Sequence, residues 1–203
     1  MGFIALIDAG AGNLRSAERA LLAAGAADVR VTSDPGLVRA ADRIVLPGQG
    51  AFAACMAGLA REDLRAALEY AVRTQGRPFL GICVGMQVLA ARGLEHGETA
   101  GLGWIGGDCR LLQAGAERLP HIGWNQATPA RVHPVLDALA PSAFVYFAHS
   151  YVLDAAAGAA WTEHGERFAS AVARDNILGV QFHPEKSQRV GLALLARFLS
   201  WKP

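Results

Sequence analysis

The chain has 203 residues, of which 52% are hydrophobic and 18% are charged. This length suits one domain with a sizeable core, and the composition excludes disordered and fibrous proteins. Because the formal net charge is only +1, charge gives no reason to expect a nucleic acid or an anionic membrane as a partner. No apolar run reaches the roughly 20 residues that a membrane-spanning helix needs.

The first half of the chain alternates short apolar runs with helical patterns. We expect strands at residues 3–7, 29–32, 43–46 and 78–82, and helices at 14–24, from 33–35 onward, at 51–60, 62–74 and 84–91. Asn13 and Gly25 are typical of the two ends of the first helix. Such alternation predicts an α/β fold with a flavodoxin-like, mostly parallel open sheet and helices on both faces. In such sheets, ligands bind beyond the carboxyl ends of the strands.

The second half has a different pattern. Aromatic and β-branched runs at residues 109–113, 144–147, 169–172 and 177–182 alternate with Gly, Pro, Asp and Asn turns. This pattern predicts a mixed, antiparallel extension of the sheet rather than further strand–helix–strand units. A last helix is expected at 188–201. With no internal repeat and no linker, residues 1–203 are predicted to form a single domain.

Cysteine usage predicts a reduced protein without metal or cofactor. The three cysteines are an odd number and form no CxxC pair, which argues against a disulfide framework. The absence of nearby histidine pairs argues against structural zinc. The apolar stretch near the N-terminus is too short for the hydrophobic region of a signal peptide. We therefore expect a protein of the reducing cytoplasm.

The strongest local motif is GICVGMQ at residues 81–87. Cys83 follows a predicted buried strand, precedes a predicted helix and has glycines two positions away on both sides, which is typical of a nucleophile elbow. Side chains around such a sharp turn would collide, and Gly81 and Gly85 remove those collisions. The start of a helix favours a thiolate, and the Val84 N–H can point at a developing oxyanion. A buried structural cysteine is the alternative.

A candidate base lies about a hundred residues downstream, in VQFHPEKS at 180–187. A thiol nucleophile needs a base, and His183 is of the usual type. Glu185 suits the third position of a triad, where a carboxylate holds the imidazole tautomer and stabilises the imidazolium. We therefore predict Cys83, His183 and Glu185 as the catalytic residues; a loop of solvated polar residues is the alternative.

A third motif, LPGQGAF at residues 46–52, also follows a predicted strand. The turn formed by Gly48, Gln49 and Gly50 can donate backbone N–H groups and reorient at little cost. It suits the second half of an oxyanion hole, beside Val84. The motif lacks the GxxxxGK[ST] spacing of a phosphate-binding loop.

The remaining cysteines and histidines carry weaker expectations. Cys55 and Cys109 have no base nearby in the sequence and are predicted to be small buried side chains. His121 and His149 lie in strand-like runs and suit either the core or a pocket wall. Turn residues surround the other histidines, which we expect to be exposed: His96, His133 and His164.

Six sequence blocks together resemble the class I, triad-type glutamine amidotransferases, and the resemblance covers nearly the whole chain. The elbow and the His-Pro-Glu block are typical of the superfamily. Other blocks point to the branch formed by the glutaminase subunits of imidazole glycerol phosphate synthase, in histidine biosynthesis. The six blocks are DAGAGNLRS at 8–16, PGQGAF at 47–52, GICVGMQ at 81–87, PHIGWN at 120–125, YFAHSY at 146–151 and VQFHPEKS at 180–187.

The resemblance implies a reaction and a partner. It implies hydrolysis of L-glutamine to glutamate and ammonia through a γ-glutamyl thioester. The ammonia would pass to a (β/α)8-barrel cyclase subunit, whose acceptor is a phosphoribosylated formimino-carboxamide nucleotide. Gln87, His149, Ser150 and Tyr151 would help to hold glutamine. A further set would lie at the face that docks the cyclase: Asn13, Trp124, Tyr146 and Lys186.

Two positions depart from the family pattern, and three alternatives stay open. Gln49 stands where valine is usual, in a turn expected to reorient on activation, and Ala9 replaces a common tyrosine. Neither change removes a catalytic group. The alternatives are the glutaminase of another amidotransferase, such as anthranilate or aminodeoxychorismate synthase, a non-catalytic scaffold, and a cysteine hydrolase of another amide.

Overall fold

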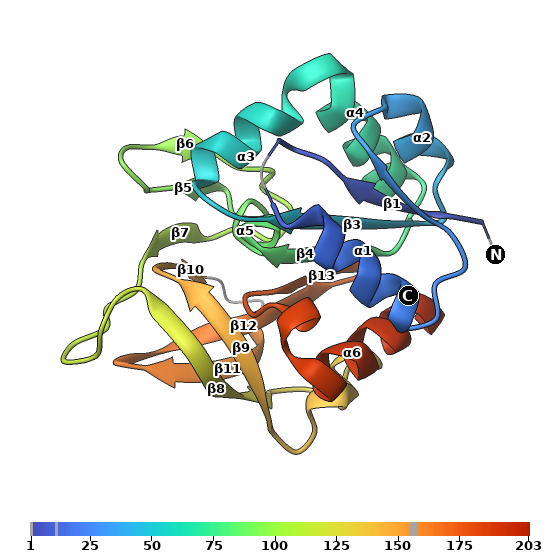
Figure 1. Cartoon of the computed structure of the whole chain (residues 1–203). Helices are drawn as coiled ribbons and strands as arrows, with labels where there is room; N and C mark the ends of the chain where they lie inside the picture. The colour runs from blue at the N-terminus through green and yellow to red at the C-terminus, as the bar shows by residue number, and fades with distance from the viewer. Residues whose placement is uncertain (1, 11, 155–157) are drawn as a thin grey trace.

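A nine-stranded sheet runs through the middle of the molecule (Figure 1). A computed structural model describes residues 2–10, 12–154 and 158–203. The strand order is β2-β1-β3-β4-β13-β12-β11-β8-β9. The first five strands in this order pair in parallel, which confirms the predicted open sheet: β2 (Val29–Thr32), β1 (Ile4–Ile7), β3 (Arg43–Gly48), β4 (Phe79–Cys83) and β13 (Ile177–Val180).

The other half of this sheet is antiparallel, as the turn-rich second half of the sequence predicts. Its strands are β12 (Glu166–Arg174), β11 (Gly158–His164), β8 (His121–Pro129) and β9 (Ala143–His149). Strand β11 was not predicted, and β8 was predicted only as a strand-like run at His121, because β8 contains Gly, Asn and Pro and β11 is rich in Ala, residues that are depleted in strands. Their pairing with neighbouring strands overrides that weak preference.

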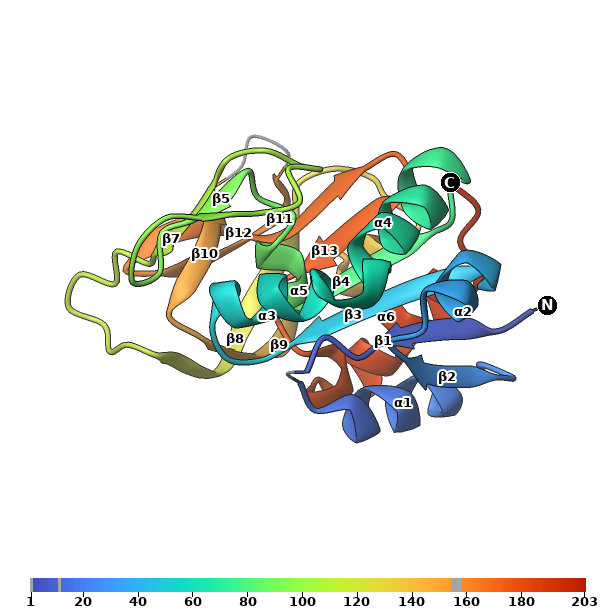
Figure 2. The same ribbon diagram turned by 90° about the horizontal axis from the view of Figure 1, so that it is seen from above.

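Helices cover both faces of the parallel half (Figures 1 and 2). α1 (Leu14–Ala23) and α6 (Gln188–Ser200) lie on one face, and α2 (Pro35–Ala40), α3 (Phe52–Leu59) and α4 (Leu64–Glu69) lie on the other. Asn13 caps α1, as predicted, because its side chain accepts a hydrogen bond from the Ser16 N–H at 3.2 Å. Among the described residues, no helix is long and apolar enough to cross a membrane.

The helix expected at residues 62–74 is in three pieces. A 3-10 turn, η1 (Arg61–Asp63), precedes α4, and a π-helical turn, η2 (Tyr70–Thr74), follows it. Asp63 causes the first break because its φ of 59° is left-handed. The remaining short turns are 3-10 as well: η3 (Leu136–Leu139) and η4 (Pro184–Lys186).

The helix predicted after Cys83 is much shorter than expected. α5 (Val84–Gln87) is a single turn, whereas the prediction ran to residue 91. The chain leaves the helix because the next carbonyls accept hydrogen bonds from a distant loop: Leu102 N donates to Val88 O at 2.8 Å and Ile105 N to Leu89 O at 3.0 Å. A second sheet, unpredicted in part, follows in the order β10 (Tyr151–Asp154), β7 (Asp108–Leu111), β5 (Arg92–Gly93) and β6 (Thr99–Ala100).

Three neighbouring parallel strands end at the same edge of the main sheet. In the strand register Gly48 pairs with Cys83, and Val180 pairs with Ile82. β13 was predicted to reach residue 182 but ends at Val180, after which the chain turns toward His183. The topology therefore brings all three predicted catalytic motifs to one edge, where ligands bind in open α/β sheets.

Candidate active site

Cys83 sits in a strained turn between β4 and α5. Its φ of 54° and ψ of −110° lie in a region of backbone conformation that residues other than glycine rarely adopt. The neighbouring glycines leave no room for a side chain: a Cβ on Gly85 would lie 1.9 Å from Leu46 O, and one on Gly81 would lie 2.4 Å from Gly85 O. A Cβ on Gly48 would lie 2.7 Å from Gly85 N. The geometry predicted for a nucleophile elbow is confirmed.

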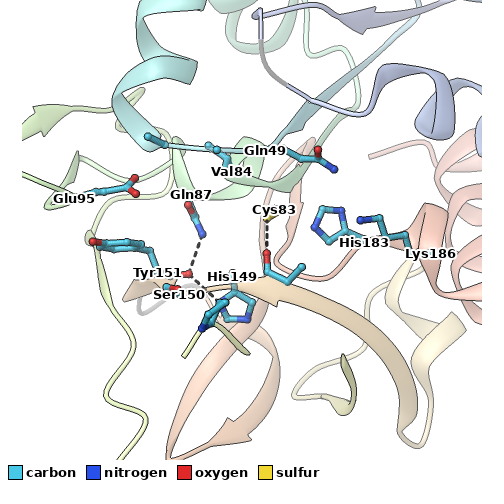
Figure 3. Close-up of a pocket in the computed structure, with 14 residues that line it drawn as sticks. Gln49, Cys83, Val84, Gln87, Glu95, His149, Ser150, Tyr151, His183 and Lys186 are labelled. Atoms are coloured by element: carbon cyan, nitrogen blue, oxygen red, sulfur yellow. Dashed lines mark hydrogen bonds between the residues drawn. The ribbon is translucent and has the colours of Figure 1, made fainter. Parts of the chain in front are cut away.

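His183 lies beside Cys83 (Figure 3), and Glu185 holds its imidazole. The distance from His183 Nδ1 to Glu185 Oε1 is 2.8 Å, and the two side chains are only 3% and 5% exposed. Because a carboxylate only accepts, Nδ1 carries the proton, and Nε2 is left for Cys83. Burial alone would lower the pKa of His183, but the adjacent Cys83 and Glu185 outweigh burial and raise this pKa to about 9. Such an imidazole favours a thiolate–imidazolium pair.

Strand β9 fixes the position of the histidine loop. His183 N donates to Tyr146 O at 2.9 Å. Ser187 closes the link, since its hydroxyl donates to His183 O at 2.7 Å and accepts from Tyr146 N at 3.0 Å. The backbone on both sides of the imidazole is therefore attached to β9, and the ring has little freedom to leave Cys83.

A cavity of about 570 Å³ opens over Cys83. Most residues predicted for the site line this cavity. Glu185 lies behind the lining, against His183, and Gly48 lies behind it, against the Cys83 turn. Among the described residues, no group of three or more His, Cys, Asp and Glu side chains could hold a metal ion. The predicted residues that line the cavity are Gln49, Gly50, Cys83, Val84, Gln87, His149, Ser150, Tyr151, His183 and Lys186.

The predicted oxyanion donors lie around the sulfur. Val84 is the first residue of α5, and no side chain in the described ranges caps this helix. The Gly48–Gly50 turn runs alongside, with the Gln49 side chain pointing toward the His183 side of the cavity (Figure 3). The expected help from a helix dipole is weaker than the sequence suggests, because α5 has a single turn.

Gln87 is bound within the protein on its donor side. Its Nε2 lies 2.8 Å from Tyr151 O and 3.2 Å from Gln181 Oε1. His149 Nδ1 lies 3.0 Å from the same Tyr151 carbonyl. Since both amide hydrogens of Gln87 have protein acceptors, the group that it can offer a ligand is its carbonyl oxygen.

Two polar side chains of the site were missed. Glu95 lines the cavity, and its Oε2 accepts a hydrogen bond from Phe52 N at 2.8 Å. Gln181 is fully buried, and its Nε2 lies 3.6 Å from Cys83 Sγ. Glu95 belongs to no motif, so no sequence signal singled it out. Gln181 lies inside the VQFHPEKS block, but only the register of β13 beside β4 shows what it contacts.

The family is decided by comparison with known proteins. The family "Glutamine amidotransferase class-I" matches residues 5–200. This chain belongs to the class I glutamine amidotransferases. It is 50% identical to imidazole glycerol phosphate synthase subunit HisH of Caulobacter vibrioides, with 100% of both chains covered. It is 53% identical to the same subunit of Zymomonas mobilis, with 98% of this chain and 96% of that one covered. The resemblance predicted from the motifs is confirmed.

Solved structures show the fold that this amidotransferase shares with distant proteins. A glutamine amidotransferase crystal structure gives a TM-score of 0.75 at 17% identity, with 97% of each chain covered. The glutaminase domain of Trypanosoma brucei CTPS gives a TM-score of 0.67 at 17% identity, with 100% of this chain and 96% of that one covered. The predicted fold class is confirmed.

Three of the four residues predicted for the docking face of this amidotransferase form one cluster. Trp124 and Tyr146 are paired across β8 and β9, with their rings edge to face at 6.0 Å between centroids. Lys186 Nζ lies 5.6 Å from the centre of the Tyr146 ring. Trp124 is 47% exposed, and Lys186 is exposed. Asn13 serves as the cap of α1, and its side chain accepts the hydrogen bond from Ser16 N–H.

The histidines are more buried than the sequence suggests. His96 is exposed as predicted, but His133 and His164 are half-buried. His164 is partly covered because its ring stacks on His121 at 4.0 Å between centroids. His121 and His149 are buried, and Cys55 and Cys109 are buried as predicted, with thiol pKa values raised by burial to about 12.

These histidines make the stability of the amidotransferase depend on pH in two directions. Burial lowers the pKa of His149 to about 3 and that of His121 to about 4, from 6.5. Below pH 6.5 the unfolded chain therefore binds protons that the folded chain does not, and the free energy of unfolding falls as the pH falls. His183 acts oppositely: its stabilising contribution is complete below pH 6.5 and is lost as the pH rises through about 9.

We expect the free energy of unfolding to fall by about 1 kcal/mol for each such buried histidine between about pH 6 and pH 5. His149→Gln should remove one such contribution, so its stability should fall less steeply than that of the unchanged chain. Urea unfolding at the two pH values measures both slopes. His96→Asn is the control, because His96 is exposed and asparagine tolerates its φ of 55°. Identical slopes for all three proteins would contradict the assignment.

Proposed function

We propose that this protein hydrolyses glutamine with Cys83, His183 and Glu185 and delivers the ammonia to a synthase partner. The observation that carries the proposal is a strained cysteine beside a buried histidine that a carboxylate holds at 2.8 Å, at the floor of a cavity. The same arrangement of nucleophile, base and orienting acid recurs in unrelated hydrolases of acyl compounds. The identity to HisH subunits over the whole chain supports glutamine as the amide and histidine biosynthesis as the setting.

The first half of the reaction forms an acyl-enzyme. The Cys83 thiolate attacks the side-chain carbonyl carbon of glutamine, and the electron pair of the C=O bond moves to oxygen. N–H groups of Val84 and of the Gly48–Gly50 turn stabilise this oxyanion. Collapse of the intermediate breaks the C–N bond, and protonated His183 gives its proton to the departing nitrogen. The products are ammonia and a γ-glutamyl thioester on Cys83.

The second half restores the enzyme. Neutral His183 takes a proton from a water molecule, and the resulting hydroxide attacks the thioester carbonyl. The C–S bond breaks, glutamate leaves, and Cys83 and His183 return to the thiolate–imidazolium pair. Glu185 holds the imidazole throughout, because its Oε1 keeps the hydrogen bond from Nδ1.

Glu95 suits the amino end of the substrate. It is the carboxylate that lines the described cavity, and the Phe52 N–H holds one of its oxygens in place. It lies away from His183, with Cys83 between them (Figure 3). Glutamine in the cavity would place its ammonium group toward Glu95 and its amide carbon at Cys83. The free carbonyl oxygen of Gln87 lines the same cavity and can accept a further hydrogen bond from that ammonium group.

The chemistry of ammonia calls for a partner. Ammonia loses its nucleophilicity once it is protonated in water, so a sealed route from Cys83 to the acceptor is needed. We propose a (β/α)8-barrel cyclase as the partner, in the reducing cytoplasm, with a phosphoribosylated formimino-carboxamide nucleotide as the acceptor. The cluster of Trp124, Tyr146 and Lys186 would contact it, because Lys186 also lines the cavity over Cys83.

The test is glutamine hydrolysis by the purified chain, first alone, then with the cyclase, and then with the cyclase and a nucleotide acceptor analogue. We expect little activity alone and a large rise in the full mixture. Full activity of the chain alone would instead indicate a free-standing amide hydrolase. Activity in none of the three mixtures would indicate a scaffold.

A further inference from the structure

A second buried side chain contacts the sulfur of Cys83. Gln181 is the residue after β13, its side chain is fully buried, and its Nε2 lies 3.6 Å from Cys83 Sγ. β13 runs parallel to β4, with Val180 opposite Ile82, so the backbone pairing itself places Gln181 next to Cys83. This contact has no part in the proposed reaction steps.

The direction of the contact is fixed by a backbone carbonyl. Tyr151 O can only accept, so the group of Gln87 that lies 2.8 Å from it is the NH2 group. The other hydrogen of that NH2 group points to the amide of Gln181 at 3.2 Å, which must therefore present its oxygen to Gln87. The nitrogen of Gln181 then faces the sulfur. The opposite orientation would set two donors against each other and an oxygen against the sulfur.

The whole network is buried, which holds it in this single arrangement. Gln87 is 4% exposed and His149 is 6% exposed. His149 Nδ1 also donates to Tyr151 O, so two side chains are anchored on the same carbonyl. A buried polar group without a partner costs about 1–3 kcal/mol, so a flipped amide here would be unstable.

We propose that Gln181 donates a hydrogen bond to the Cys83 thiolate and stabilises it, as a second group beside His183. Hydrogen bonds to an ionised acceptor are about twice as strong as those between neutral groups. Because α5 is a single turn, its dipole stabilises a thiolate only weakly, so a hydrogen-bond donor beside the sulfur can have a measurable effect. The inference rests on the proposed role of Cys83 as the nucleophile.

The experiment is the pH profile of Cys83 alkylation by iodoacetamide, measured on the chain alone. Cys83 lines the cavity, whereas Cys55 and Cys109 are buried outside its lining, so labelling reports Cys83, and Cys83→Ala gives the blank. Gln181→Met removes the amide at similar length. We expect its profile to shift upward by about one pH unit, with alkylation roughly tenfold slower on the acid side. Ser170→Ala is the control, because the Ser170 hydroxyl is buried without a partner in the described structure and its carbonyl accepts from Gln181 N.

A Gln181→Met profile that coincides with the profile of the unchanged chain overturns the inference, since a purely structural Gln181 would change stability alone. If Gln181→Met gives no cooperative unfolding transition, Gln181→Asn takes its place. The asparagine amide is one methylene too short to reach the sulfur, so the same upward shift of the alkylation profile is expected. An unchanged profile for Gln181→Asn would also overturn the inference. A separate outcome tests the proposed function. If Cys83 of the unchanged chain reacted with the same pH profile as free glutathione, Cys83 would not be an activated nucleophile.

Discussion

Cys83→Ala is expected to abolish glutamine-dependent synthesis by the complex with the cyclase, by roughly 10⁴-fold or more, because no covalent intermediate can form. Synthesis from added ammonia should continue at the rate of the unchanged complex, because the proposed acceptor site lies on the partner. The measurement compares product formation with glutamine and with an ammonium salt, using the same preparation of complex.

The control for that experiment is another buried cysteine. Cys55 lies in α3 and does not line the cavity, so Cys55→Ala should retain both activities despite a small loss of core volume. Loss of both activities in Cys83→Ala would indicate that the variant no longer assembles with its partner. Retention of both would show that Cys83 is not the nucleophile and would favour a scaffold.

The parts of the site that the sequence predicts best are those set by local sterics. The Cys83 turn needs small neighbours at fixed offsets, and Gly81 and Gly85 meet that need within five residues of chain. The pair of His183 and Glu185 is equally local, since only one proline separates them. Short-range constraints of this kind leave a pattern that can be read without a structure.

The parts that the sequence does not predict are set by contacts across the chain. Gln181 and Cys83 are 98 residues apart, and Glu95 is held by the backbone of Phe52, 43 residues away. Neither contact leaves a periodic pattern. The length of α5 fails for the same reason, because the loop at residues 101–107 takes over the hydrogen bonds that would continue the helix. Strands β8 and β11 likewise owe their conformation to the neighbours with which they pair.

The fold class follows from sequence more readily than these details because it depends on many residues at once. The runs in β1, β3, β4 and β13 are almost fully buried, so each must lie inside a sheet that is covered on both sides. A change at any single residue would leave that pattern intact. The site depends on a few residues only, so a single added atom at the Cys83 turn would disturb its geometry.

Gly85→Ala tests how tightly that elbow is packed and should have a large effect on stability. The new Cβ would lie 1.9 Å from the Leu46 carbonyl oxygen, and both atoms belong to backbone segments that cannot rotate away. Either β3 or the Cys83 turn must move. We expect a loss of about 3 kcal/mol or more in the free energy of unfolding, out of the roughly 5–15 kcal/mol that a typical domain has. Urea unfolding measures it, and iodoacetamide labelling of any folded fraction reports whether Cys83 keeps its reactivity.

Gly36→Ala is the matched control, because it adds the same methyl group in the first turn of α2. There the new Cβ would meet only the Asp34 carboxylate, at 3.0 Å, and alanine is the better helix former by about 1 kcal/mol. Its stability should stay within about 1 kcal/mol of the unchanged chain. If Gly85→Ala behaved like this control and kept its reactive cysteine, the turn at Cys83 would have room for an additional methyl group. The strained φ of Cys83 would then not depend on its glycine neighbours, and the steric reason for the GxCxG spacing would be wrong.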